Sequence, residues 1–340
     1  MMKPPDCWRR SKQDSCNNMI LIVSYPGEEH TVEVVQRLEQ RGREVHLLDL
    51  AEFPAKSLAF SWPNTHRGLY TIDNHLGSID LRKVGVGWWR RIRPFCVDDK
   101  VGDPSARAFV ESETSQAVCG MLDALGCQWV NDRAADDKAQ HKPYQWAVAN
   151  QIGLNLPRTL VTNKPEEARR FIEEIGIGKV IFKAFLASYD AWRETRLVMR
   201  EDVDKLELVR YAPVIFQEYI EGVDLRITAI GDKLFPAEID ARKTSYPVDM
   251  RMVVGESDVK AVRLPSKVEK ALLKLQHELG LSFGAIDMRR TSDGKYYFFE
   301  VNPAGQWLFV EQRSGLAISD AMADHLSAFD EAAQMGRSGQ

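Results

Sequence analysis

Hydrophobic and polar positions over residues 19–50 predict a β-strand, an α-helix and a second β-strand. Residues 19–24 form a short apolar run, and a Pro26-Gly27 turn separates it from an amphipathic stretch at 29–41. An apolar run of strand length followed by helix-length spacing of hydrophobic residues is typical of a βαβ unit. The opening of the chain therefore indicates an α/β fold class.

The α/β pattern continues over the next part of the chain. A strand is expected at 84–90, a long helix at 104–125 and a short strand at 128–131. We expect these elements to complete a first α/β domain over residues 19–135, which follows a polar tail at residues 1–18.

Two further lobes are expected, and both mix strands with helices. The whole chain is therefore predicted to be α/β (α+β). Residues 136–213 alternate short strands with helices, whereas residues 214–330 begin with three strands and end with a hairpin and a helix, before a polar tail at 331–340. The helices expected in these lobes lie at 143–152, 165–175, 202–210, 266–279 and 317–329. The strands expected before the hairpin lie at 158–162, 180–185, 196–200, 214–220, 224–231 and 234–241.

The clearest local signal is a β-hairpin near the C-terminus. Two strand runs, FGAIDMRR and KYYFFEVN, flank an Asp-Gly pair at 293–294, which is a strong signal for a two-residue hairpin turn. If those two residues form the loop, counting back along both strands places Asp287 directly opposite Glu300. By the same count, Asn302 lies opposite Ala285.

Alternation of side chains then places Asp287, Glu300 and Asn302 on one face of the hairpin, together with Tyr296 and Phe298. Two carboxylates that face each other across a sheet are destabilising unless a cation lies between them. Mg²⁺ uses such oxygen ligands when it binds with a nucleotide. A magnesium site is therefore the favoured interpretation, and a solvated polar face is the alternative. The opposite, apolar face is expected to carry Ile286, Met288, Phe299 and Val301.

Several stretches of the chain resemble the ATP-grasp superfamily. GAIDM and FFEVNPAGQW resemble its metal-binding strands, VIFKAF resembles its strand with a nucleotide-binding lysine, and FQEYIEGVDLR resembles its adenine-binding hinge. VGWWRRIRPF, WVND, HKPYQWAVANQIGLNLPRT, AEIDAR, VDMR and NPAGQWLFVE are most similar to the RimK-type branch that contains the microviridin and graspetide macrocyclases. The resemblance covers about residues 19–329. It implies an ATP-grasp fold with an N-terminal pre-ATP-grasp lobe and two lobes that clamp ATP.

The resemblance implies that Asp287, Glu300 and Asn302 hold Mg²⁺ and that Lys142 and Lys183 contact the phosphates of ATP. For Lys183 the residues agree, because an ammonium in an apolar strand needs an anionic partner unless it reaches water from a sheet edge. For Lys142 they do not, because a lysine at the start of a helix is usually solvated.

The resemblance also implies an adenine-binding hinge and two arginines at the reaction centre. Adenine would bind chiefly backbone groups of Glu218 and Ile220, and Asp224 or Glu221 would lie near the ribose. Arg226 and Arg251 would face the γ-phosphate and the reacting carboxylate. From the residues alone, Asp224 and Arg226 share one face of a strand and could instead form ion pairs with each other or with neighbours. The hinge comprises Gln217, Glu218, Tyr219 and Ile220.

One stretch departs from the family pattern. Between Lys183 and the hinge the family has a glycine-rich loop over the phosphates, whereas this chain reads AFLASYDAWRETRLVM, without glycine. Ser188, Arg193 and Arg196 are candidates to contact the phosphates instead.

The tryptophans and arginines of the WWRRIR motif have two interpretations. Trp88 and Trp89 are interpreted as core residues, with a binding platform as the alternative. Arg90, Arg91 and Arg93 form either a surface patch or an anion site.

Composition narrows the function classes. A net charge of −4 provides no basic field for nucleic acid or an anionic membrane. No apolar run is long enough to cross a bilayer, and the polar N-terminal stretch lacks the core of a signal peptide. The five cysteines lack the spacing of a zinc site or a disulfide framework. We expect a cytoplasmic protein with no nucleic-acid or membrane partner, and a homodimer remains open.

The expected reaction is ATP-dependent and Mg²⁺-dependent ligation of a carboxylate to an amine or hydroxyl through an acyl phosphate. By the subfamily resemblance, the substrate is a ribosomally made precursor peptide whose Asp or Glu side chains are joined to Lys, Ser or Thr. A small amino acid, a dipeptide or a protein C-terminus is the alternative substrate. A nucleotide-binding regulator without turnover is a third hypothesis, which the glycine-free loop suggests.

Overall fold

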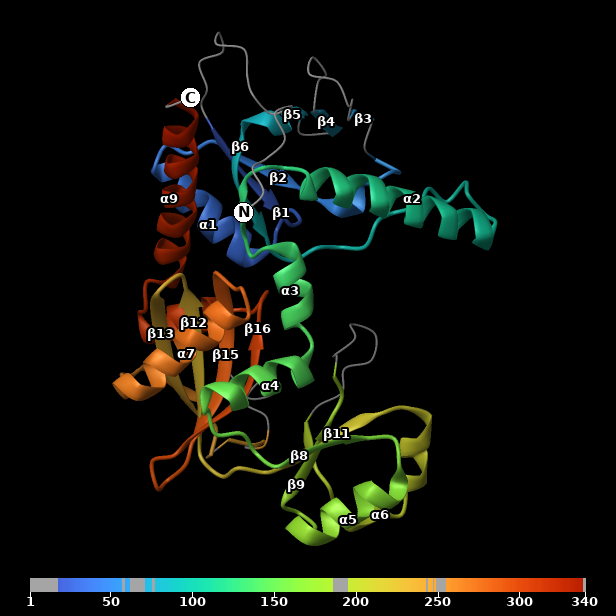
Figure 1. Cartoon of the computed structure of the whole chain (residues 1–340), viewed down its shortest axis with the longest axis vertical. Helices are drawn as coiled ribbons and strands as arrows, with labels where there is room; N and C mark the ends of the chain where they lie inside the picture. Colours follow the sequence, from blue (N-terminus) through green and yellow to red (C-terminus); the bar gives the residue numbers. More distant parts are fainter. Residues whose placement is uncertain are drawn as a thin grey trace. The chain divides into compact units, whose positions relative to one another are not determined.

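The computed structural model describes residues 18–56, 59–61, 71–74, 77–185, 195–242, 244–246, 248 and 255–338. The chain divides into two compact units (Figure 1). Unit 1 comprises Met1–Asp136 and Ala317–Gln340, and unit 2 comprises Asp137–Leu316. The chain therefore leaves unit 1 once and returns to it near its C-terminus.

Unit 1 is built on a four-stranded parallel sheet with the strand order β2-β1-β6-β7. All five residues of the central strand β1 are buried, which is typical of a parallel strand covered on both faces. The parallel sheet confirms the α/β class expected for this part of the chain. Its strands are β1 (Met19–Val23), β2 (Val45–Leu48), β6 (Val84–Trp89) and β7 (Gln128–Val130).

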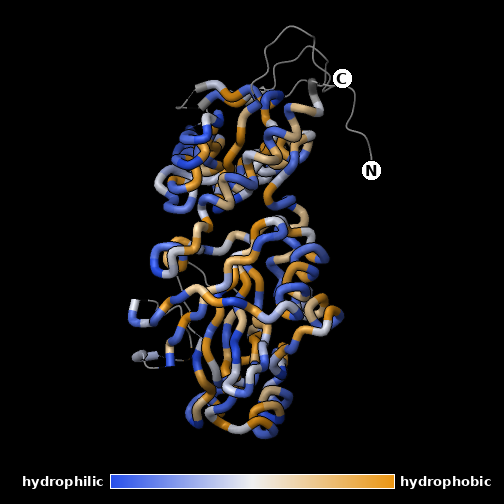
Figure 2. Tube along the Cα trace, turned by 90° about the vertical axis from the view of Figure 1, so that its left-hand side faces the viewer, coloured by the Kyte–Doolittle hydropathy of each residue, from blue (hydrophilic) through white to orange (hydrophobic). Residues whose placement is uncertain are grey.

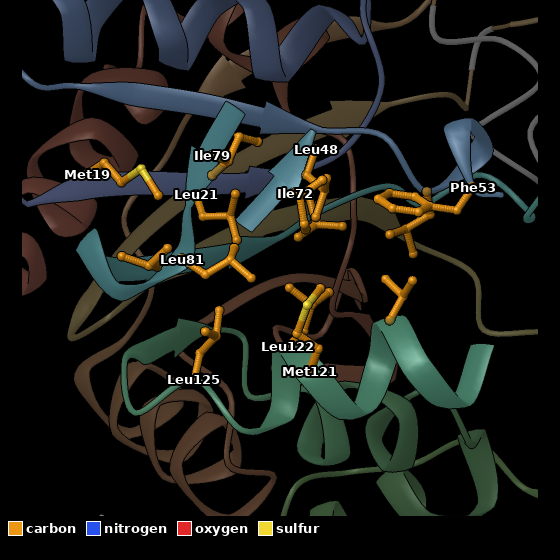
Figure 3. Close-up of a cluster of buried hydrophobic side chains, with 14 of the residues drawn as sticks. Met19, Leu21, Leu48, Phe53, Ile72, Ile79, Leu81, Met121, Leu122 and Leu125 are labelled. Carbon is orange, nitrogen blue, oxygen red and sulfur yellow. The ribbon is translucent and has the colours of Figure 1, made fainter. Parts of the chain in front are cut away.

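Helices α1 (Glu29–Gln40) and α2 (Pro104–Asp123) belong to unit 1. Helix α2 begins where the Asp103 carboxylate accepts a hydrogen bond from the Ala106 amide, with proline in the first turn. Figure 3 shows Met121 and Leu122 of this helix facing the strand residues of the core. Strands β3 (Ala59–Ser61), β4 (Thr71–Asn74) and β5 (Gly77–Asp80) form a small antiparallel sheet.

The C-terminal helix differs from the prediction. Instead of ending near residue 329 before a polar tail, α9 runs over Ile318–Ser338, and it belongs to unit 1 rather than to the preceding lobe. It lies beside α1 (Figure 1), where Arg41 Nη2 is 2.8 Å from Asp324 Oδ1. Ion pairs between segments so far apart in sequence leave no local pattern, which is why the return was not predicted.

Unit 2 contains a small antiparallel sheet with the strand order β10-β9-β11-β8. Helix α5 (Pro165–Ile175) packs on it through Ala168 and Ile172. The helix predicted at 202–210 is instead split into α6 (Arg200–Val203) and a 3-10 helix at Leu206–Tyr211. The strands are β8 (Thr159–Thr162), β9 (Val180–Lys183), β10 (Arg196–Leu197) and β11 (Val214–Glu218).

The larger sheet of unit 2 is antiparallel, with the order β14-β13-β12-β15-β16. Hydrophobic and polar residues are interleaved along its strands (Figure 2), so one face joins a hydrophobic core with helices α4 (Lys142–Ile152) and α7 (Ser266–Glu278). The other face carries the charged side chains of Asp224, Arg226, Asp287 and Arg289 and is called the polar face below. The strands are β12 (Val223–Ile230), β13 (Lys233–Asp240), β14 (Asp258–Ala261), β15 (Phe283–Arg290) and β16 (Tyr296–Asn302).

Two short helices, like strand β14, were not expected from the sequence. Helix α3 (Arg133–Ala139) spans the domain boundary expected at residues 135 and 136, and α8 (Leu308–Ser314) follows the hairpin. Trp307 precedes α8, is fully buried and stacks edge-on against Phe283 at 5.2 Å between ring centroids. This contact fixes the segment that follows β16.

Candidate functional site

Strands β15 and β16 bring three oxygen-bearing side chains together on the polar face. Asp287 pairs directly with Glu300, and Ala285 pairs with Asn302, as predicted. The Asn302 amide nitrogen lies 3.4 Å from Asp287 Oδ2 and 3.3 Å from Glu300 Oε1. The amide side chain therefore bridges two carboxylates that face each other.

The hairpin reaches this register by a different route from the one predicted. The turn is one residue longer than a two-residue loop, because the Thr291 amide donates to the Lys295 carbonyl at 2.9 Å. A bulge at Phe299 then shifts the register back, so that Met288 pairs with Phe298 while Asp287 still pairs with Glu300.

The bulge corrects the predicted positions of three aromatic residues. Phe298 is fully buried in the apolar core, and Tyr296 packs against that core, although both were expected on the polar face. Phe299, expected on the apolar face, instead lies 5.6 Å from the Arg289 guanidinium. One extra residue in a strand reverses the facing of the residues between it and the turn.

Helix α4 holds the bulged edge strand through two side chains. The indole nitrogen of Trp146 donates to the Phe299 carbonyl at 2.8 Å. Gln145, which is almost fully buried, binds both the amide and the carbonyl of Val301 at 2.8 Å. Sequence reasoning gave these two residues no role beyond the resembling motif, because a helix-to-strand contact over more than 150 residues has no local signal.

Two cations neutralise the facing carboxylates. Arg226 Nη1 lies 2.6 and 2.8 Å from the two oxygens of Asp287, and the Lys142 ammonium contacts Glu300. The solvated position expected for Lys142 from the residues alone is therefore wrong. Charge-assisted bonds of this kind are about twice as strong as neutral ones.

A second ion pair lies beside the first on the same face. Arg289 Nε and Nη2 lie 2.8 and 2.7 Å from Asp224 Oδ1, and its Nη1 donates to the Ile220 carbonyl at 2.9 Å. The Arg289 guanidinium also lies 5.4 Å from the Tyr219 ring. Asp224 and Arg226 thus pair with neighbours on β15, not with each other. Arg289, to which sequence reasoning gave no role, ties the hinge to the carboxylate-bearing strand.

The proposed hinge begins in the last two residues of strand β11 and continues beyond it. Gln217 is buried, and its Oε1 accepts a hydrogen bond from Lys183 Nζ at 3.3 Å. The amides of Glu218 and Tyr219 donate to the carbonyls of Arg158 and Lys179, both at 2.8 Å. The Glu218 amide is therefore already used within the protein.

Part of the predicted site falls outside the described residues. Arg251, Ser188 and Arg193 lie there, as does most of the glycine-free loop. Arg196 is described, and its Nη2 lies 2.9 Å from Asp202 Oδ1, so this arginine is held by a neighbouring carboxylate.

No cluster of three or more metal-binding Asp, Glu, His or Cys side chains occurs in the described part of the chain. A metal at β15 and β16 would therefore take two carboxylates and the Asn302 amide oxygen, and the amide would have to turn its oxygen toward the ion. Carboxylate and amide oxygens suit Mg²⁺, which keeps positions for waters and phosphate oxygens. The donor set thus fits the ion that the sequence predicted.

The WWRRIR motif is structural where it is buried. Trp88 belongs to the buried core and Trp89 packs against it, as interpreted from the sequence. Arg90 is fully buried, and its Nη2 lies 3.5 Å from Glu28 Oε1. Arg93 pairs with Asp49. These ion pairs favour a structural role over an anion site.

Among the described residues, no helix is both long enough and apolar enough to cross a membrane.

Two family models match the chain. The model described as the MvdD pre-ATP grasp domain matches residues 19–137. The model described as the RimK-like ATP-grasp domain matches residues 135–326, which is more than half of the chain.

Solved structures match nearly the whole chain. Macrocyclase MdnC of Microcystis aeruginosa MRC, bound with precursor peptide MdnA, is 30% identical, with a TM-score of 0.82 over 91% of this chain and 99% of that one. A RiPP-associated ATP-grasp ligase of Chryseobacterium gregarium, in complex with ADP and a leader and core peptide, is 25% identical, with a TM-score of 0.82 over 92% and 97%. These likenesses confirm the ATP-grasp fold.

A curated relative is a D-alanine–D-alanine ligase of Aquifex aeolicus, which is 28% identical over 200 residues. The match covers 54% of this chain and 66% of that relative, so the chain spans about two thirds of the relative's length.

Proposed function

Because the chain belongs to the RimK-like ATP-grasp family and is thus an ATP-grasp ligase, we propose that it forms amide or ester crosslinks within a ribosomally made precursor peptide. The observation that carries the substrate class is the likeness, over more than nine tenths of the chain, to ligases solved with precursor peptides. ATP and Mg²⁺ are the cofactors that the family implies, and cytoplasmic action, where ATP and new peptides are available, is part of the proposal.

The proposed reaction has two steps. A carboxylate oxygen of an Asp or Glu side chain attacks the γ-phosphorus of ATP, the bond from that phosphorus to the bridging oxygen breaks, and ADP leaves. The nitrogen or oxygen of a Lys, Ser or Thr side chain then attacks the acyl carbon. It loses its proton, phosphate leaves, and an amide or ester remains. No protein nucleophile is required.

The chain's own residues would bind and orient the reactants. Asp287, Glu300 and Asn302 would hold Mg²⁺, which when bound neutralises charge on the phosphates. Lys142 and Lys183 would bind phosphate oxygens as point charges. Arg226 and Arg251 would face the transferring group, where fixed positive charge stabilises the transition state more than the ground state.

The hinge would bind the base of the nucleotide. Gln217, Glu218, Tyr219 and Ile220 would contact adenine, with Asp224 near the ribose. Arg289 supports this part of the proposal, because it contacts the Ile220 carbonyl and Asp224 together. Residues 136–213 and 214–330 are proposed as the two lobes that clamp the nucleotide.

Mass spectrometry tests the proposal directly. The pure protein with Mg-ATP and acidic precursor peptides should form ADP and remove one water from the peptide for each bond formed. Asp287→Asn and Glu300→Gln should each lower the rate roughly 100-fold or more, since each removes a charged ligand of the proposed metal. Turnover that survives both substitutions would exclude this metal site.

A small-molecule ligase is the second candidate, favoured by the likeness to a D-alanine–D-alanine ligase. Supplying D-alanine, L-glutamate and dipeptides in the same assay separates the two. ADP formation with these compounds, and none with any acidic peptide, would replace the peptide assignment.

A further inference from the structure

The two facing carboxylates already have cations in contact with them. Lys142 Nζ contacts Glu300 Oε2, and Arg226 Nη1 lies 2.6 Å from Asp287 Oδ1. The four side chains are only 9 to 13% exposed. Charges so far removed from water attract each other more strongly than exposed pairs do. The protein therefore supplies, from its own side chains, positive charge of the kind that a divalent ion would supply.

The two cations are held differently. Arg226 projects from the central strand β12, makes two bonds to Asp287 and donates a third, at 3.1 Å, to the Gln306 carbonyl. Its planar fork is fixed by these three acceptors. Lys142 is the first residue of α4 and carries a point charge on a flexible four-carbon stem. It can change partners without any movement of the backbone.

We propose that Lys142 is a placeholder cation: it neutralises Glu300 in the absence of the metal and moves to the nucleotide phosphates when Mg²⁺ and ATP bind together. Arg226 remains on Asp287 throughout. The inference rests on the proposed Mg-ATP site and adds the exchange of partners by Lys142.

The exchange makes metal and nucleotide depend on each other. A metal ion that arrives alone must displace the ammonium and leave it beside a second positive charge. A nucleotide that arrives alone brings its phosphates toward the Glu300 carboxylate. When the metal and the nucleotide arrive together, every charge gains an opposite partner. The metal should therefore strengthen nucleotide binding, and the nucleotide should strengthen metal binding by the same factor.

The test measures metal binding without any nucleotide. Mn²⁺ serves as the probe, because it accepts the same oxygen ligands and its free concentration can be read by electron paramagnetic resonance. The full-length Lys142→Met protein should bind Mn²⁺ roughly tenfold more tightly than wild type, and Mn-ADP should be bound roughly tenfold more weakly. A lysine that only binds phosphate would weaken Mn-ADP and leave binding of Mn²⁺ alone unchanged.

Two matched variants test whether the effect on Mn²⁺ binding comes from the positive charge that neutralises Glu300. Lys142→Arg keeps a positive charge at this position and should bind Mn²⁺ as wild type does. Lys183→Met should weaken Mn-ADP but leave Mn²⁺ affinity unchanged, because the Lys183 ammonium donates to the Gln217 side chain. Thermal unfolding of each variant checks that it is folded, and Lys142→Gln replaces Lys142→Met if the latter is not.

The outcomes separate the two proposals. If wild type binds Mn-ADP and the neutral Lys142 variant binds Mn²⁺ no more tightly than wild type, the placeholder role is rejected and the ligase site stands. If wild type binds neither Mn²⁺ nor Mn-ADP, the metal and nucleotide site itself is rejected.

Discussion

Single residues on the polar face of the large sheet are arranged as alternating opposite charges. Arg226 lies across from Asp287, and Asp224 lies across from Arg289, so between β12 and β15 each acidic residue of this face meets a basic residue. Opposite charges directly across a sheet stabilise it, whereas like charges destabilise it. Between β15 and β16, Asp287 meets Glu300 instead, so a cation bound at this like-charged pair stabilises the sheet.

Gly305 is a residue whose small size the site requires. A Cβ at this position would lie 2.3 Å from the Ala285 Cβ and 3.3 Å from Arg226 Nη2. Gly305→Ala should therefore displace the segment that holds Arg226. We expect a loss of about 1–3 kcal/mol in the free energy of unfolding, measured in urea, together with slower ADP formation.

Gly120→Ala is the matched control for this substitution. Gly120 lies within helix α2, and nothing lies within 4 Å of a Cβ built there. Alanine in a helix is favoured over glycine by roughly 0.5–1 kcal/mol, so this variant should be as stable as wild type or more stable. If Gly305→Ala is as stable as Gly120→Ala and forms ADP as fast as wild type, the close contact at Gly305 is relieved without cost.

At the scale of elements, the C-terminal hairpin shows what the sequence could reveal. Turn chemistry and strand alternation predicted the two strands and the facing of Asp287 and Glu300. The longer turn and the bulge at Phe299 were not predicted, and the pairing was still correct because these two one-residue shifts cancel. The bulge is held by Trp146 of a distant helix, and contacts of that kind cannot be read from local periodicity.

The start of helix α1 depends on a charged cap. The Glu28 carboxylate accepts a hydrogen bond from the Thr31 amide at 2.7 Å and contacts His30 at 3.0 Å. Burial alone would raise the pKa of Glu28, but the hydrogen bond with His30 and the charge of Arg90 outweigh it and lower the pKa from 4.5 to about 2. The folded state therefore favours the ionised carboxylate.

The contribution of Glu28 to stability should depend on pH. Because its pKa is lower in the folded protein, the stabilisation is complete above pH 4.5 and disappears as the pH falls to about 2. Glu28→Gln should cost about 3 kcal/mol in the free energy of unfolding at pH 7. The difference from wild type should be smaller at pH 3.

A neighbour on the same helix provides the comparison. Glu33 is 39% exposed and pairs with Arg37, so Glu33→Gln should change stability by less than about 0.5 kcal/mol at either pH. If the difference in free energy of unfolding between Glu28→Gln and wild type does not change with pH, the Glu28 carboxylate does not cap the helix in its ionised form.

For the whole molecule, the division into two units separates the site from the rest of the chain. All described residues of the proposed nucleotide and metal site lie in unit 2, whereas the parallel sheet and α9 belong to unit 1. Local opening in proteins occurs in cooperative units, and a ligand stabilises the unit that binds it. The effect of Mg-ADP should therefore be concentrated in one part of the chain.

Amide hydrogen exchange measures this distribution. With Mg-ADP at 100 times its dissociation constant, amides at Tyr219, Ile220 and β16 should exchange up to about 100-fold more slowly, since binding then stabilises the native state by about 2.7 kcal/mol. Amides in β1 and β6 serve as the internal reference and should change little. ADP without Mg²⁺ should protect β16 much less, because in the proposed site Glu300 and Asn302 would contact the nucleotide only through the metal. Strong protection of β1 and β6, with none in β16, would place the nucleotide away from the facing carboxylates.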